Sequence, residues 1–168
     1  MHPLTDCIDY NLKILFIGFN PSILSSETGH HFANPSNRFW TILYQSGLTP
    51  RKYKPEEDRD LLKLGYGLTN MVARPTRAAV DISKEEYLVG KKKLIEKIHH
   101  YAPAIACFVG KGVYHEFADK RNIAWGVQEC SIVEGTIDFV APSSSGLVRM
   151  KLPEVVGIYT KLAQLITS

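Results

Sequence analysis

Residues 13–22, KILFIGFNPS, decide how this chain folds and where its chemistry is to be sought. The apolar run over residues 13–18 is short and bounded by turn residues, which is typical of a strand buried on both faces. Gly18 permits a close approach of backbone that a side chain would obstruct. Asn20-Pro21 then ends the strand, because proline disfavours helical angles in the residue before it. A core strand therefore delivers a neutral amide to its end.

Strands and helices alternate along the rest of the chain. Further strands are expected at 67–70, 105–109 and 137–141, with helices at 38–46, 56–64, 84–101, 112–120 and 153–166. Ser83 and Glu86 have the spacing of a capping box, and Pro153 suits the first turn of the last helix. The alternation predicts a three-layer α/β/α sandwich around a central, mainly parallel four-stranded sheet. Ligands bind beyond the carboxyl ends of such strands, so loops 18–22, 70–74, 110–111 and 142–149 are predicted to share one rim.

Composition places the chain among ordinary globular proteins. Its 168 residues predict one domain over 1–168, with 45 % hydrophobic and 22 % charged residues. The net charge of +3 is compatible with a nucleic-acid partner but too small to argue for one. Cys7, Cys107 and Cys130 are widely separated, which favours reduced and mostly buried thiols over disulfides or a metal cluster. No signal peptide or membrane-spanning run is recognisable, so an intracellular, cytoplasmic protein with no membrane partner is expected.

The loop over residues 18–40 is long and rich in aromatic residues. Loops of this length inside a compact domain are usually functional or disordered, and the aromatic content argues against disorder. Phe39 and Trp40 are interpreted as core anchors, whereas Phe32 is placed where a flat ring can stack on a flat ligand. His30-His31 has no acidic or cysteine partner at a recognisable spacing, so no metal site is predicted.

Two other loops carry polar groups to the same rim. Residues 141–149, APSSSGLVR, offer three hydroxyls to phosphate oxygens, and Leu147 resembles the apolar wedges that enter base stacks. Residues 67–76, GLTNMVARPT, end a second strand in an amide, Asn70. Amides both donate and accept hydrogen bonds, which suits reading the imide edge of a pyrimidine.

Four blocks in this order, GFNPS, GHHFANPSNRFW, GLTNMVARPT and PSSSGLVR, resemble the mismatch-specific uracil-DNA glycosylase and thymine-DNA glycosylase family of the uracil-DNA glycosylase superfamily. The resemblance covers at least residues 13–149. It implies a monofunctional glycosylase of base excision repair. Such an enzyme flips uracil, thymine or a modified pyrimidine opposite guanine out of the duplex and hydrolyses its N-glycosidic bond, leaving an abasic site. It further implies double-stranded DNA with mismatched or damaged bases as the partner, no metal or organic cofactor, and a monomer.

The resemblance also assigns roles to single positions. Asn20 matches the motif asparagine that positions the attacking water. The positions matched to base binding are Phe19 through its backbone, Phe32 through its ring, and Asn70, His31 and Ser25. The positions matched to phosphate contacts and to the wedge that fills the gap beside the orphaned guanine are Ser22, Ser143, Ser144, Ser145, Gly146, Leu147 and Arg149.

The chain departs from the family pattern at two positions and leaves other functions open. Ser22 stands where the family has glycine and is expected to crowd the deoxyribose phosphate. Phe19 stands where it has isoleucine and is expected to tighten the base pocket. Because neither Asn20 nor Ser22 is an acid or a base, a catalytically silent module that binds mismatched DNA is the alternative function. A serine hydrolase using Ser22 or Ser25 with His31 is a further one, although no Gly-x-Ser-x-Gly elbow is present.

Overall fold

A five-stranded sheet forms the centre of the computed structural model, which describes residues 4–167. The strands β1 (Ile14–Gly18), β2 (Tyr66–Asn70), β3 (Ile105–Val109) and β5 (Ile137–Ala141) are parallel, and β4 (Gly126–Val127) runs antiparallel to β5. The strand order is β2-β1-β3-β5-β4. The four predicted strands are confirmed. The prediction of four strands in total is wrong, because β4 has only two residues and so shows no alternation that a sequence pattern could reveal.

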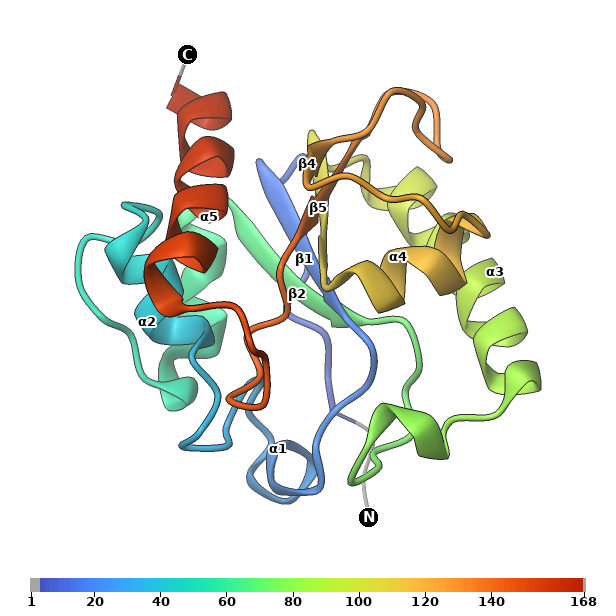
Figure 1. The fold of residues 1–168 in the computed structure, drawn as a ribbon, viewed down its shortest axis with the longest axis horizontal. Helices are drawn as coiled ribbons and strands as arrows, with labels where there is room; N and C mark the ends of the chain where they lie inside the picture. The colour runs from blue at the N-terminus through green and yellow to red at the C-terminus, as the bar shows by residue number, and fades with distance from the viewer. Residues whose placement is uncertain (1–3, 168) are drawn as a thin grey trace.

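Helices cover both faces of the sheet, which confirms the three-layer prediction (Figure 1). One face carries α2 (Phe39–Gln45), α5 (Leu152–Thr167) and the 3₁₀ helix η1 (Pro55–Leu64), and the other carries α3 (Lys84–Tyr101) and α4 (Lys111–Ala118). Successive side chains of a strand point to opposite faces. Phe16 therefore packs in the α2 and α5 layer, while Ile17 packs in the α3 and α4 layer.

Local signals in the sequence set several helix ends. Ser83 Oγ accepts a hydrogen bond from Glu86 N, and Glu86 Oε1 accepts one from Ser83 N, which is the predicted capping box. The helix expected over 56–64 is a 3₁₀ helix instead. The short helices α1 (Ile23–Thr28) and η2 (Ala79–Asp81) lie in segments expected to be loops. Within residues 4–167, no helix combines the length and apolar character that crossing a membrane requires.

Candidate active site

The loops after β1 and β2 are joined backbone to backbone at the carboxyl edge of the sheet. Gly18 and Asn70 are register partners, Met71 N donates to Gly18 O, and Val72 N donates to Phe19 O, both at 2.8 Å. A Cβ on Gly18 would lie 2.8 Å from Asn70 Oδ1, so the Asn70 side chain reaches over this glycine. The structure thus brings the two strand-end amides to one rim, as parallel strands that end in register require.

Asn20 is held by its amide nitrogen. Nδ2 donates to Arg74 O and to Thr76 Oγ1, both at 2.8 Å. The Thr76 hydroxyl donates its own proton to Ala78 O at 2.8 Å, so toward Asn20 it can only accept. Because both partners can only accept, the amide atom that faces them is the nitrogen. None of the residues 4–167 donates a hydrogen bond to Asn20 Oδ1, so the carbonyl oxygen remains available as an acceptor.

Phe19 contributes its backbone to the rim and its ring to the core. The ring lies against Tyr87, with 6.3 Å between ring centroids, and a Cβ on Gly112 would lie 2.6 Å from Phe19 Cζ. The ring therefore packs between α3 and α4, and the expectation that it tightens a base pocket stays a prediction. Among residues 4–167, no acceptor pairs with the backbone N–H of Phe19 or of Asn20. These two N–H groups are free to donate to a ligand.

Phe32 lies on the α2 side of the sheet. Its ring stacks on Phe39 with centroids 3.9 Å apart and an interplanar angle of 11°. Trp40 Nε1 donates to Phe32 O at 3.2 Å, and the backbone of Phe32 has a positive φ of 50°. The ring is half-buried and fixed by a partner on one face, an arrangement that suits stacking a flat base on the other.

Two residues matched to base binding have structural contacts instead. His31 is buried, its Nε2 donates to Thr5 O at 2.8 Å, and its backbone N donates to Asp58 Oδ2 at 2.9 Å. Ser25 is also buried, and its Oγ accepts from Ala33 N at 3.0 Å. Both side chains brace the loop from within, so these contacts lend no support to a direct role in base binding. The position of these two residues in the sequence could not show that their side chains turn inward.

The fold gives His31 the acidic and cysteine partners that sequence spacing did not show. Ligand atoms of Cys7, His31 and Asp58 all lie within 4.8 Å of one another, and all three residues are buried. Nε2 of His31 is a donor to Thr5, so Nδ1 carries the lone pair that a metal ion could use. Burial and the nearby Asp58 charge raise the pKa of Cys7 to about 12, so it is a thiol at neutral pH. Asp58 already accepts hydrogen bonds from the backbone of His31 and Arg59, which accounts for this buried carboxylate without a metal.

The serine loop projects one apolar side chain into solvent. Ser143 Oγ accepts from Ser145 N and Ser145 Oγ accepts from Leu147 N, both at 3.2 Å. Ser144 is buried, and its carbonyl accepts from Arg38 N at 2.9 Å. Leu147 is 95 % exposed. The loop is thus anchored to the segment before α2, and Leu147 lies outside any core, as a wedge requires.

Other predicted DNA-contacting residues have mixed surroundings. A Cβ on Gly146 would lie 2.7 Å from Ser36 O, so only glycine fits there without a shift. Arg149 is exposed. Ser22 is the N-cap of α1, and its Oγ accepts from Ser25 N at 3.0 Å. Sequence reasoning did not single out Arg38, whose Nε and Nη2 are buried and have no hydrogen-bond partner among residues 4–167.

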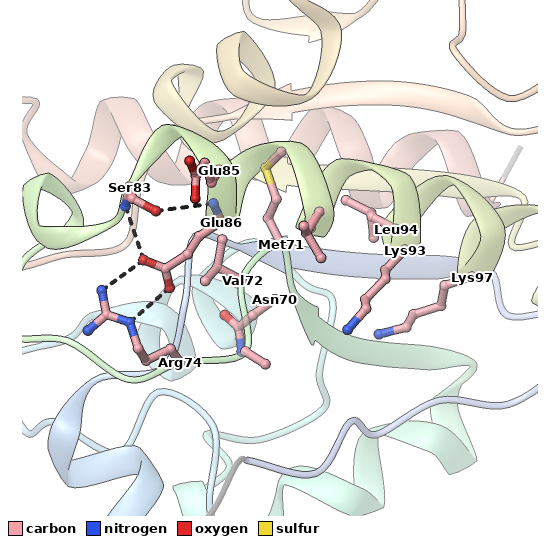
Figure 2. Close-up of a pocket in the computed structure, with 13 residues that line it drawn as sticks. Asn70, Met71, Val72, Arg74, Ser83, Glu85, Glu86, Lys93, Leu94 and Lys97 are labelled. Carbon is pink, nitrogen blue, oxygen red and sulfur yellow. Dashed lines mark hydrogen bonds and ion pairs between the residues drawn. The ribbon is translucent and has the colours of Figure 1, made fainter.

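A cavity of about 450 Å³ lies on the α3 side of the loop that follows β2 (Figure 2). Met71, Val72 and Leu94 give it apolar walls. Lys93 and Lys97 lie toward one end, and Arg74 with Glu86 lies toward the other. Lys97 Nζ pairs with Asp6 and donates to Thr69 Oγ1. Asn70, one of the two rim amides, lines this cavity, whereas Asn20 and Phe32 do not, so the cavity adjoins the rim on its α3 side.

Comparison with known proteins identifies the superfamily and the fold of this chain. The family model of the Uracil DNA glycosylase superfamily matches residues 5–163. The fold is similar to the solution NMR structure of a candidate uracil DNA glycosylase from Methanosarcina acetivorans, with a TM-score of 0.59 and 23 % sequence identity. That match covers 96 % of this chain and 97 % of the other. Because the family model spans nearly the whole chain, the chain belongs to the uracil DNA glycosylase superfamily.

Proposed function

We propose that this chain is a monofunctional glycosylase that removes uracil, and other mispaired or damaged pyrimidines opposite guanine, from double-stranded DNA. The observation that carries the proposal is the orientation of Asn20. Its amide nitrogen is bound to Arg74 O and Thr76 Oγ1, which leaves the carbonyl oxygen to accept a hydrogen bond from water. Such a water can be aimed at the C1′ atom of a flipped nucleotide. An amide cannot take up the proton, so catalysis depends on how well the leaving base is stabilised.

The groups around Asn20 suit a departing pyrimidine. Uracil and thymine can leave as anions with charge on O2, and the unpaired N–H groups of Phe19 and Asn20 are donors for that charge. One well-placed donor of this kind is worth roughly 3–4 kcal/mol in the transition state. Phe32 supplies a ring for stacking, and Asn70 supplies an amide for the imide edge. Cytosine is a poorer leaving group, so the same site would discriminate against it.

The serine loop suits a duplex substrate. Flipping a base costs a few kcal/mol and costs least when the base is mispaired, so part of the selectivity for G·U or G·T pairs comes from the DNA itself. Leu147 is fully available to fill the vacancy, and Arg149 follows it for contact with the orphaned guanine. Ser143 and Ser145 have hydroxyl protons to offer to phosphate while their oxygens order the turn.

The test is base excision from a 5′-labelled duplex with a single G·U pair, under enzyme excess and followed by alkali. Strand breakage reports base removal. Asn20→Ala should slow excision at least about a hundredfold while the affinity for the duplex stays unchanged. Asn122→Ala, in an exposed loop after α4, is the matched control and should excise like the wild type.

The outcomes separate the candidate functions. Duplex binding without strand breakage would identify a silent mismatch-binding module. Breakage that persists undiminished in Asn20→Ala would refute the role of this residue. A panel in which only the lesion and the opposing base vary then ranks uracil, thymine, hypoxanthine and alkylated bases.

A further inference from the structure

Arg74 takes part in the candidate site through its backbone and in a clamp through its side chain. Its carbonyl oxygen accepts one of the two hydrogen bonds from Asn20. Its guanidinium donates from Nε to Glu86 Oε2 at 2.8 Å and from Nη2 to Glu86 Oε1 at 2.9 Å, a bidentate pair. Nη2 also donates to Asp81 O at 2.8 Å. One residue therefore links the candidate catalytic amide to the start of α3.

The other half of the clamp is fixed to a rigid element. Glu86 belongs to the capping box of α3, where it accepts a hydrogen bond from Ser83 N while it binds Arg74 (Figure 2). One turn further along, α3 touches the loop itself, because a Cβ on Gly90 would lie 2.1 Å from Met71 O. The first turns of α3 thus hold the loop that follows β2 by an ion pair at one point and by backbone contact at another.

The direction of the Arg74 carbonyl depends on such support. Arg74 lies in a connection between β2 and η2, where no strand partner fixes the peptide plane. Pro75 restricts Arg74 to extended backbone angles, which narrows the range without choosing one direction. Anchoring the Arg74 side chain removes the remaining freedom. We propose that Arg74 and Glu86 are positioning residues that hold the Asn20 amide in the orientation its water requires.

A phosphate contact is the competing role for an exposed arginine near this rim. Nε and Nη2, the edge that would pair with a phosphate in two hydrogen bonds, are already bound to Glu86 and to Asp81 O. The Arg74 hydrogen bonds hold the pKa of Glu86 down to about 2, so the pair stays ionised across the pH range of any excision assay. The geometry therefore favours a role within the protein.

The inference rests on the proposed function and is tested with double-mutant cycles. Single-turnover excision is measured for Arg74→Ala and Glu86→Gln, each in the wild type and in Asn20→Ala, on a duplex whose 5-fluorouracil is an easier leaving group. A residue that acts through Asn20 should slow the wild type about tenfold, as misplacement of a catalytic group does. In the Asn20→Ala background the same change should alter the rate by less than about twofold.

The pair between Arg51 and Glu57 is a matched control. It is also bidentate and exposed, and Glu57 likewise accepts from the backbone at the start of its helix, η1. Arg51→Ala should leave excision unchanged in both backgrounds. Thermal unfolding of every variant is measured in parallel, because an exposed ion pair adds little to stability; Glu86→Gln, which keeps a capping side chain, covers the case in which Arg74→Ala does not fold.

The outcomes distinguish this inference from the proposed function. A wild type that breaks no strand, or Asn20→Ala at full activity, overturns the function itself. Suppose that the wild type excises the base and that Asn20→Ala is impaired. The positioning role is then refuted if Arg74→Ala excises like the wild type, or if it loses the same factor in both backgrounds. A weaker affinity for the duplex with a salt slope smaller by about 1 would show that Arg74 contacts phosphate instead. Loss in the wild-type background alone, at unchanged affinity, supports the proposal.

Discussion

Truncating Leu147 to alanine offers a sharp test of the wedge, because this side chain does nothing for the fold of the free protein. It is 95 % exposed, so Leu147→Ala leaves no cavity and should not change the melting temperature. In the DNA complex the side chain would be buried between bases. The substitution removes three carbons, which at about 0.8 kcal/mol per buried methylene amounts to about 2.4 kcal/mol. That free energy corresponds to a loss of about 60-fold in the population of the flipped state.

The assay compares single-turnover excision of uracil from a G·U duplex and from the same strand without its complement. The duplex rate should fall by tens of fold, whereas the single-stranded rate should change little, since no stack has to be opened. Leu88→Ala, a 69 % exposed leucine on α3, is the matched control and should change neither rate. Equal losses on both substrates would show that Leu147 does not act as a wedge.

Three further predictions concern the surroundings of the site. Thr76→Val keeps the shape of the side chain but removes the acceptor for Asn20 Nδ2. Losing one hydrogen bond of about 1 kcal/mol should slow single-turnover excision about fivefold, and an unchanged rate would contradict the assigned amide orientation. Burial lowers the pKa of His31, so below its ordinary pKa of about 6.5 the unfolded chain binds a proton that the folded chain does not. Urea unfolding should therefore show that the free energy of unfolding falls from pH 7 to pH 5, with up to about 1.4 kcal/mol per pH unit from this residue. The same pH slope in His31→Gln would contradict this prediction. Excess EDTA should leave excision unchanged, and added Co²⁺ should give no thiolate charge-transfer band. Such a band would show that Cys7, His31 and Asp58 bind a metal ion.

The fold could be predicted where the sequence marks both ends of an element. β3 and β5 begin and end where their apolar runs do, and α3 begins at its capping box. α1 could not be predicted, because its six residues lie among Gly, Pro and Asn, and its cap, Ser22, also suits a loop. A segment shorter than two helical turns has too few residues to show a period.

The site could be predicted only as far as strand ends determine it. Asn20 and Asn70 follow two parallel strands that end in register, Gly18 opposite Asn70, so topology alone places both at one rim. The direction of the Phe19 ring does not follow from topology, because it depends on the space left by Gly112 on α4, far along the chain. His31 is turned inward by its contact with Thr5, which no local pattern records.

The partners of Asn20 also determine what a more acidic residue could do there. An aspartate in principle offers a general base for the attacking water. In this site, however, one carboxylate oxygen of Asn20→Asp would face Arg74 O and Thr76 Oγ1, two acceptors, because the threonine proton is committed to Ala78 O. That repulsion favours the protonated acid and raises its pKa. Asn20→Asp should therefore excise uracil more slowly than the wild type at pH 8 and recover part of the rate as the pH falls, when the acid can donate to Arg74 O. Single-turnover rates from pH 5 to pH 8 measure this, and an Asn20→Asp enzyme faster than the wild type at pH 8 would show that the amide is not held as described. An amide suits this position because both neighbours of its inner atom, Arg74 O and Thr76 Oγ1, accept a hydrogen bond from it.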